Sequence, residues 1–371
     1  MSKHYLTALY AVVASLGSLS CVQSSSNDNS SQIQAVSPTD SLATAETVAL
    51  FNRLYNGEKL LVGHQDDLSY GHSWYEIEGR SDMKETTGIY PDVCGWEFGG
   101  LELGDPVNID SVDFNNMRKH MQETHRMGGI NTMTWHSYNL ITGNNCWDVS
   151  VNGVVSAILP DGPKHAQYLK WLDRFADFVS SIKDDNDNLI PLLFRPYHEL
   201  TGSWFWWGRD LCSVEEYKSL WRMTYNYLTQ EKGVHNLLYV YSTSNFNDTT
   251  LFFERYPGDE FVDLLGFDIY QYGEDLALAQ QDFLKQLKLQ ADILSPIAKE
   301  KGKPWAVCEA GLESCLIDNW FTELGKVLAP TDARYILFWR NARDRENHFY
   351  IPYEGHSAAP DFKAFVDNTR Q

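Results

Sequence analysis

Eight short apolar runs alternate with longer amphipathic stretches along most of this chain, and this alternation restricts the possible folds more than any other feature. Short apolar runs between turn residues are typical of buried strands, and apolar positions at helical spacing are typical of helices. Eight strand-helix units predict an α/β fold of the (β/α)8, or TIM barrel, type. The predicted strands are residues 60–65, 93–98, 129–136, 189–199, 237–244, 262–271, 304–309 and 335–340.

Helical spacing between these runs predicts helices that return the chain to the start of the next strand. No internal repeat and no break in composition after about residue 45 marks a second domain. We therefore predict one domain over residues 45–371. The clearest helices are residues 113–126, 164–182, 214–229, 276–301, 319–327 and 360–368.

The first 44 residues have a different character. Lys3 precedes an apolar run too short to span a bilayer, which predicts an export signal over residues 1–20. Cys21 follows small residues and resembles the lipidated cysteine of a bacterial lipobox, although Ser18 stands where Leu is usual, so an ordinary cleaved signal is the alternative. The polar, Ser-rich segment after Cys21 predicts a flexible tether over residues 21–44. We expect an exported lipoprotein that faces the periplasm or the cell surface and meets the membrane only through Cys21.

Charge and cysteine content exclude several classes of partner. The formal net charge is -20 and no cluster of Lys or Arg interrupts it, so a nucleic acid would be repelled over most of the surface. The five cysteines after Cys21 contain no C-x-x-C pair, so the sequence indicates neither a disulfide framework nor a zinc ribbon.

Polar and aromatic residues gather where the predicted strands end. In a TIM barrel the active site lies at the C-terminal ends of the strands, so these residues should meet at one mouth. The strand-end residues with chemistry to offer are His64, His136, His198, Glu199, Tyr270, Glu309, Trp339 and Arg340.

Glu199 and Glu309 end the fourth and seventh predicted strands and form a pair of carboxylates. Glycoside hydrolysis needs such a pair, one protonated and one ionised, and a separation of about 5–5.5 Å goes with retention of configuration. Glu199 precedes the aromatic run 204–207, which would raise its pKa by desolvation, whereas Tyr270 and either Arg195 or Arg340 could keep Glu309 ionised. We expect no metal and no organic cofactor, because two carboxylates suffice for this chemistry.

The segment Arg195-Pro-Tyr-His-Glu-Leu-Thr-Gly-Ser-Trp-Phe-Trp-Trp-Gly208 resembles the acid/base segment of glycoside hydrolase family 26, which consists mainly of β-mannanases. The resemblance covers residues 45–371 and implies that this domain is catalytic, with Glu199 as acid/base and Glu309 as nucleophile. The related clan usually has Asn before the acid/base, and here His198 stands there, as in family 26. A contact from His198 to the axial 2-hydroxyl of mannose would favour mannan over cellulose.

The resemblance also implies roles for other strand-end residues. Tyr270 would orient Glu309, and Trp204 and Trp339 would stack on sugars near the cleaved bond. The remaining predicted substrate contacts are His64, His136, Trp147 and Arg340. The implied partners are β-mannan, glucomannan, galactomannan and manno-oligosaccharides, and we expect a monomer.

Other functions stay open at this point. Zinc hydrolysis is not one of them: residues 198–202 begin like a zinc-protease helix, but the second His is missing and a Gly turn follows a strand. A chain-end enzyme that releases mannobiose, or a β-1,3-xylanase or β-glucanase, would use the same barrel and glutamates. A glycan-binding surface lipoprotein without activity is the alternative from another class.

Overall fold

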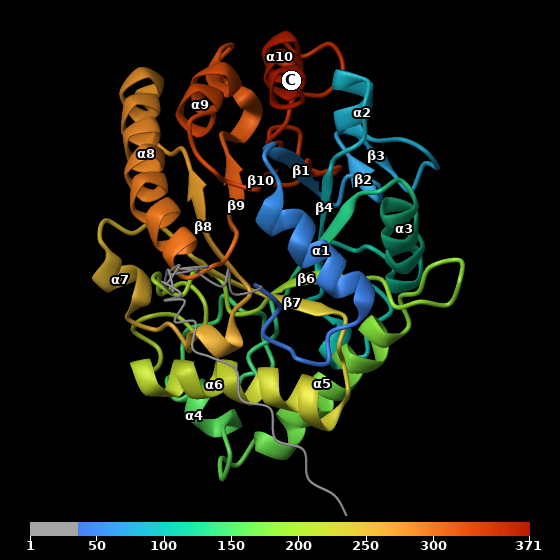
Figure 1. Ribbon diagram of the computed structural model, residues 1–371, viewed down its shortest axis with the longest axis vertical. Helices are drawn as coiled ribbons and strands as arrows, with labels where there is room; N and C mark the ends of the chain where they lie inside the picture. The colour runs from blue at the N-terminus through green and yellow to red at the C-terminus, as the bar shows by residue number, and fades with distance from the viewer. Residues whose placement is uncertain (1–35) are drawn as a thin grey trace, which may run out of the picture. The chain divides into compact units, whose positions relative to one another are not determined.

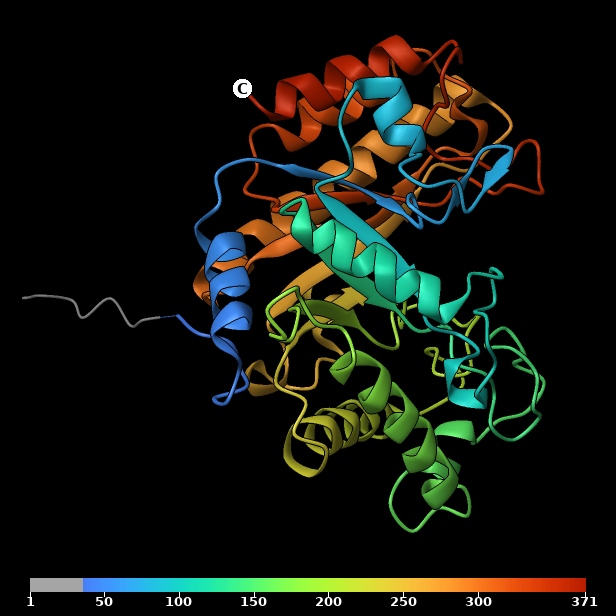
Figure 2. The ribbon, with the colours of Figure 1, turned by 90° about the vertical axis from the view of Figure 1, so that its right-hand side faces the viewer.

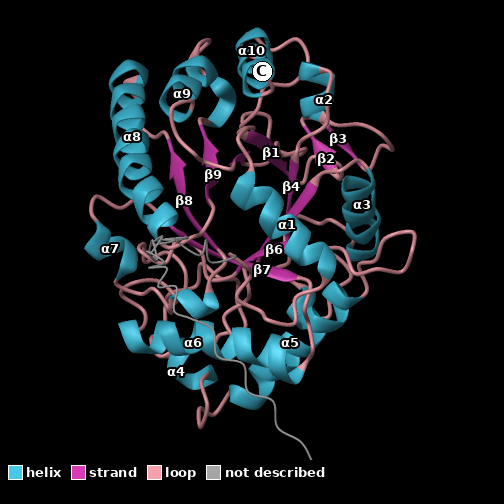
Figure 3. Cartoon of the chain, viewed as in Figure 1, coloured by secondary structure: helices cyan, strands magenta, loops and turns pink. Residues whose placement is uncertain are grey.

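Parallel strands close into an eight-stranded barrel in the order β1-β10-β9-β8-β7-β6-β5-β4, which confirms the predicted (β/α)8 fold (Figures 1 and 3). The computed structural model describes residues 36–371. Each predicted run overlaps one barrel strand, and the seventh strand extends two residues beyond its predicted end. The strands are β1 (Leu61–Gln65), β4 (Val93–Glu97), β5 (Ile130–Thr134), β6 (Leu192–Arg195), β7 (Leu237–Thr243), β8 (Leu264–Tyr270), β9 (Trp305–Gly311) and β10 (Tyr335–Phe338).

Helices surround the barrel (Figure 3), and several of them begin at a side chain that caps free backbone N–H groups. Asp113 accepts hydrogen bonds at the start of α3, Ser213 forms a capping box at the start of α6, and Asp275 caps α8. The helices are α1 (Ala45–Asn56), α2 (Asp82–Thr87), α3 (Phe114–Arg126), α4 (Val154–Ile158), α5 (His165–Ser180), α6 (Val214–Asn226), α7 (Thr249–Phe253), α8 (Leu276–Glu300), α9 (Trp320–Leu328) and α10 (Ala359–Thr369).

The barrel separates two apolar cores, because successive strand residues point to opposite faces. Inside it, Leu193, Leu264 and Leu337 pack together with Phe51 of α1, and a larger core fills the space between strands and helices. Helix α1 therefore covers one end of the barrel, and Figure 2 shows the hairpin of β2 (Tyr70–Gly71) and β3 (Trp74–Tyr75) at the opposite end.

Asp82 ties the hairpin to the last loop of the barrel. Its carboxylate accepts hydrogen bonds from the backbone N–H of His72 at 2.7 Å, the indole of Trp74 at 2.6 Å and the side-chain amide of Asn341 at 2.8 Å. Asn341 follows β10, so residues about 260 positions apart share one buried acceptor. This arrangement orders the long segment after β1 beside the site.

Residues 36–44, which the sequence assigns to the tether, contact the barrel domain. The backbone N–H of Thr39 donates to Asp263 at 2.7 Å, Asp40 lies 2.7 Å from His235, and Thr44 caps α1. Val36 also packs against the apolar core inside the barrel.

The predicted export signal and the lipidation of Cys21 lie outside the described residues. No helix within residues 36–371 is long and apolar enough to cross a membrane. The cysteines in this part of the chain are all free: Cys94, Cys146, Cys212, Cys308 and Cys315.

Candidate active site

Glu199 stands on a tight turn after β6. Both Tyr197 and Glu199 adopt left-handed backbone angles, with φ of 49° and 55°. Residues other than glycine rarely adopt this conformation, and it is found most often where surrounding structure holds a functional group in place. Here the backbone N–H of Glu199 donates to Ser242 at the end of β7 at 2.9 Å, and the Tyr217 hydroxyl donates to the Tyr197 carbonyl at 2.9 Å.

The surroundings of Glu199 favour its protonated form. Its carboxyl group is partly buried and accepts one hydrogen bond, from the indole N–H of Trp204 at 2.6 Å. Burial, followed by the charges of Asp268 and Glu309, raises the pKa of Glu199 well above its usual range. A carboxyl group that keeps its proton near neutral pH is suited to act as a general acid.

Glu309 lies within β9 in the opposite kind of surroundings. It is 4% exposed, accepts a hydrogen bond from the Tyr270 hydroxyl at 2.7 Å, and forms an ion pair with Arg195. Arg195 also pairs with Asp268 at 2.7 Å, and Asp268 accepts from Ser242 at 2.8 Å. Donors on both oxygens stabilise the ionised carboxylate. Of the two arginines considered from the sequence, Arg195 makes this contact, whereas Arg340 pairs with Asp110 at 3.1 Å.

His136 is held by Glu97, a residue that the sequence analysis did not select. The fully buried Glu97 accepts from His136 Nδ1 at 2.6 Å, from the His136 backbone N–H at 2.9 Å and from the Thr134 hydroxyl at 2.9 Å. Burial opposes a charge on His136, but Glu97 raises the pKa of His136 overall. A carboxylate at the end of the second predicted strand was the available signal, since neighbouring strand ends meet at one mouth.

His198 packs edge-on against His136, with ring centroids 4.6 Å apart. Burial, together with the charge of Arg195, lowers the pKa of His198 well below its usual range. The site therefore holds one imidazole that favours the charged form and one that favours the neutral form.

A groove of about 460 Å³ opens beside this cluster. Trp147 is 49% exposed and stacks on His136 with ring centroids 5.2 Å apart, and Trp339 and Arg340 line the same groove. Trp204 is 44% exposed beside Glu199. The sequence did not indicate the other residues that line the groove, which come from long loops: Ile109, Asp110, Tyr138, Asn145, Arg345 and His348.

The prediction that His64 contacts substrate is wrong. Its side chain is fully buried, with Nδ1 2.6 Å from Asp67. Its neighbour Val62, two residues earlier on β1, packs in the core between strands and helices, and His64 shares that face. Trp206 and Trp207 are also buried, at 1% and 0% exposed, as expected for structural aromatic residues.

One group of residues in the described part of the chain has the spacing of metal ligands. Donor atoms of His198, Asp268 and Glu309 lie within 4.8 Å of one another. Arg195 already pairs with both carboxylates, so a cation at this position would have to displace a buried guanidinium. The arrangement fits an organic substrate better than a metal ion.

A (β/α)8 barrel whose C-terminal mouth combines a glutamate with a raised pKa, a glutamate bound by an arginine and a tyrosine, and exposed tryptophans has the architecture of a glycoside hydrolase. Comparison with known proteins then specifies the family. The chain belongs to glycosyl hydrolase family 26, whose model matches residues 36–305.

Similar proteins agree with this assignment. A mannan endo-1,4-β-mannosidase from Bifidobacterium adolescentis is 35% identical over 371 residues, which cover 94% of this chain and 36% of that protein. A Bacillus subtilis protein of the same name is 27% identical and is covered over 64% of its length, so the chain spans only part of these relatives. Among solved structures, the family 26 β-mannanase BoMan26A from Bacteroides ovatus superposes with a TM-score of 0.85 and 42% identity, covering 88% of this chain and 94% of that one.

Proposed function

We propose that this protein is a retaining β-1,4-mannan hydrolase in which Glu199 is the acid/base and Glu309 the nucleophile. The observation that carries the proposal is the opposite surroundings of the two glutamates on one rim of the barrel. The names of the relatives support mannan as the substrate, since both curated proteins described above are mannan endo-1,4-β-mannosidases.

The proposed reaction has two displacements. The Glu309 carboxylate attacks the anomeric carbon while Glu199 gives its proton to the glycosidic oxygen, so one C–O bond forms as the other breaks. The leaving sugar departs as an alcohol, and a glycosyl-enzyme remains on Glu309. Glu199, now ionised, takes a proton from a water molecule that attacks the same carbon and frees Glu309.

The other predicted residues would position the sugar and the nucleophile. Tyr270 and Arg195 would orient Glu309, and the adjacent imidazoles of His136 and His198 would hydrogen-bond hydroxyls of the sugar at the cleaved bond. Trp147, Trp204 and Trp339 would stack on the C–H faces of sugars, and Arg340 would donate to their hydroxyls.

A time course on linear β-1,4-mannan tests this function. We expect mixed manno-oligosaccharides with an early fall in viscosity, and NMR of the first products should show the β-anomer. Mannobiose alone with preserved viscosity would indicate a chain-end enzyme. Release of sugar only from β-1,3-xylan or β-glucan, or saturable binding without any product, would contradict the proposal.

We further propose export and anchoring through a lipid on Cys21, and a monomeric state. Cys21 and the small residues that precede it support the anchor. Cys21→Ala should move the protein from the membrane fraction to the soluble fraction of its expression host, with catalytic constants unchanged. An unaltered distribution would contradict lipidation at Cys21, and light scattering of the soluble variant tests the monomer.

A further inference from the structure

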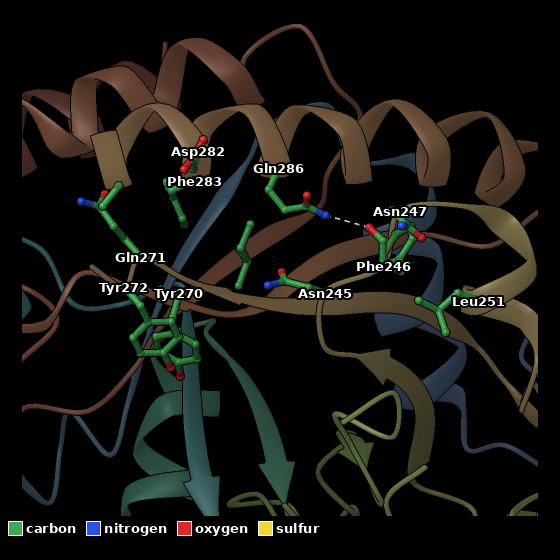
Figure 4. Close-up of a pocket in the computed structure, with 12 residues that line it drawn as sticks. Asn245, Phe246, Asn247, Leu251, Tyr270, Gln271, Tyr272, Asp282, Phe283 and Gln286 are labelled. Carbon is green, nitrogen blue, oxygen red and sulfur yellow. Dashed lines mark hydrogen bonds between the residues drawn. The ribbon is translucent and has the colours of Figure 1, made fainter. Parts of the chain in front are cut away.

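A second cavity lies beside the candidate active site, between the loop after β7, the end of β8 and helix α8. We call it the α8 pocket. It measures about 450 Å³, and Figure 4 shows Tyr270 and Tyr272 at one end, Asn245 near the middle, and Asn247 with Leu251 at the other end. Asp282 and Gln286 reach it from α8. Only Tyr270 of these residues belongs to the predicted site.

The lining of the α8 pocket suits an uncharged sugar. A pyranose ring has an apolar C–H face and a rim of hydroxyls, so it binds where an aromatic ring lies among amide and carboxylate groups. Tyr272 is 79% exposed and lies 6.1 Å from the Tyr270 ring. The amides of Asn245 and Asn247 and the carboxylate of Asp282 supply donors and acceptors. No Lys or Arg lines the pocket, which disfavours an anionic ligand.

Strand order places this pocket opposite the groove lined by Trp147, Trp339 and Arg340, which we call the Trp147 groove. In the closed barrel, β6 and β9 separate β7 and β8 on one side from β10, β1, β4 and β5 on the other. Glu199 follows β6 and Glu309 lies in β9. When a glycosidic bond lies between them, one part of the polysaccharide extends toward β7 and β8 and the other part toward the opposite side. The Trp147 groove is built after β4, β5 and β10, whereas the α8 pocket is built from β7 and β8.

The α8 pocket is also joined to the reacting groups. Tyr270 lines the pocket, and its hydroxyl donates to Glu309 at 2.7 Å. A sugar that contacted the Tyr270 and Tyr272 rings would therefore lie next to a sugar held at Glu309. We infer that the α8 pocket binds an uncharged hexose of the polysaccharide, on the far side of the cleaved bond from the Trp147 groove.

This inference rests on the proposed function, and the hexose has two sources: a more distant unit of the main chain, or a side group on it. The test variant is Asn247→Ala combined with Asp282→Ala. Both side chains are exposed, and neither is hydrogen-bonded or ion-paired within residues 36–371, so the fold should tolerate their loss. The matched control, Gln281→Ala with Glu300→Ala, removes one amide and one carboxylate from α8 outside the pocket.

The measurement is kcat/KM for manno-oligosaccharides of increasing length, for linear mannan and for galactomannan. Loss of two polar contacts should lower kcat/KM about tenfold on the longest oligosaccharide and less than about twofold on mannotriose. A main-chain unit predicts this loss on linear mannan, and a side group predicts a loss confined to galactomannan.

An equal loss at every length and on both polysaccharides would overturn the inference, because it would indicate a disturbed catalytic centre. Kinetics like those of the wild type on every glycan would also overturn it while leaving the proposed function intact. If the wild-type chain cleaves none of these glycans, the proposed function fails and the inference fails with it.

Discussion

The two predicted catalytic glutamates share one rim, but the end of β6 and the end of β9 support them in opposite ways. Glu199 follows a left-handed turn, is partly desolvated and accepts one hydrogen bond from Trp204. Glu309 sits in regular strand, with Tyr270 on one oxygen and Arg195 on the other. The difference supports the proposed roles of the two glutamates: burial with few donors favours a protonated acid, and donors together with a cation suit a carboxylate nucleophile.

The largest expected effect comes from removing the nucleophile. Glu309→Ala should lower kcat on mannan by about 10⁴-fold or more, because it removes the carboxylate on which the proposed covalent intermediate forms. Circular dichroism and binding of mannohexaose check that the fold and the cleft survive. Appreciable remaining turnover would mean that β9 does not carry the nucleophile.

Removing the acid should have a smaller effect that depends on the substrate. Glu199→Gln should lower kcat/KM on mannan by about 10²- to 10⁴-fold, the usual contribution of a general acid, but should change formation of the glycosyl-enzyme from an activated aryl mannoside far less. Equal losses on both substrates would argue against the acid role.

The pH dependence supplies an independent check on Glu199. Because its pKa is raised, the protonated acid persists toward neutral pH, and activity on mannan should fall as pH rises through that pKa. The activated aryl mannoside needs little protonation of its leaving group, so formation of the glycosyl-enzyme from it should show a much smaller alkaline fall. If the fall remained unchanged, another group would be responsible for it.

The sequence predicted the positions of the site residues better than it predicted the backbone conformation that holds them. Both glutamates and Tyr270 could be found because strand ends in a (β/α)8 barrel are identifiable from apolar runs. The strained turn could not: the predicted strand 189–199 ends in the structure at Arg195, and left-handed residues at Tyr197 and Glu199 leave no pattern in the sequence. His64 was wrongly assigned to the substrate site for a related reason: the sequence does not show whether a residue at a strand end faces the helices or the barrel mouth.

A change at Glu97 tests how a carboxylate alters the pKa of a neighbouring side chain, and its expected effect on activity is of intermediate size. Glu97→Gln keeps an acceptor for His136 but removes the negative charge 2.6 Å from Nδ1. The pKa of His136 should fall, so its imidazolium should be lost at lower pH, and kcat on mannan near neutral pH should drop by about tenfold. NMR titration of the His136 ring measures the pKa directly. An unchanged pKa together with a lower kcat would reduce Glu97 to a structural support.

The smallest expected effect concerns the turn itself. The Tyr197 hydroxyl is buried between Thr224, at 2.7 Å, and Tyr168, and it helps to hold the backbone on which Glu199 stands. Tyr197→Phe would leave both partners without this contact, at a cost of about 1–3 kcal/mol in the free energy of unfolding. We expect a thermal midpoint a few degrees lower and a modest loss of kcat on mannan.

Tyr239→Phe is the matched control, because the Tyr239 hydroxyl is buried without a hydrogen-bond partner in the described part of the chain. Its removal should leave the midpoint nearly unchanged. If Tyr197→Phe behaved like this control, the hydrogen bonds of the backbone, including those to Ser242, Tyr217 and Trp207, would suffice to hold the left-handed turn.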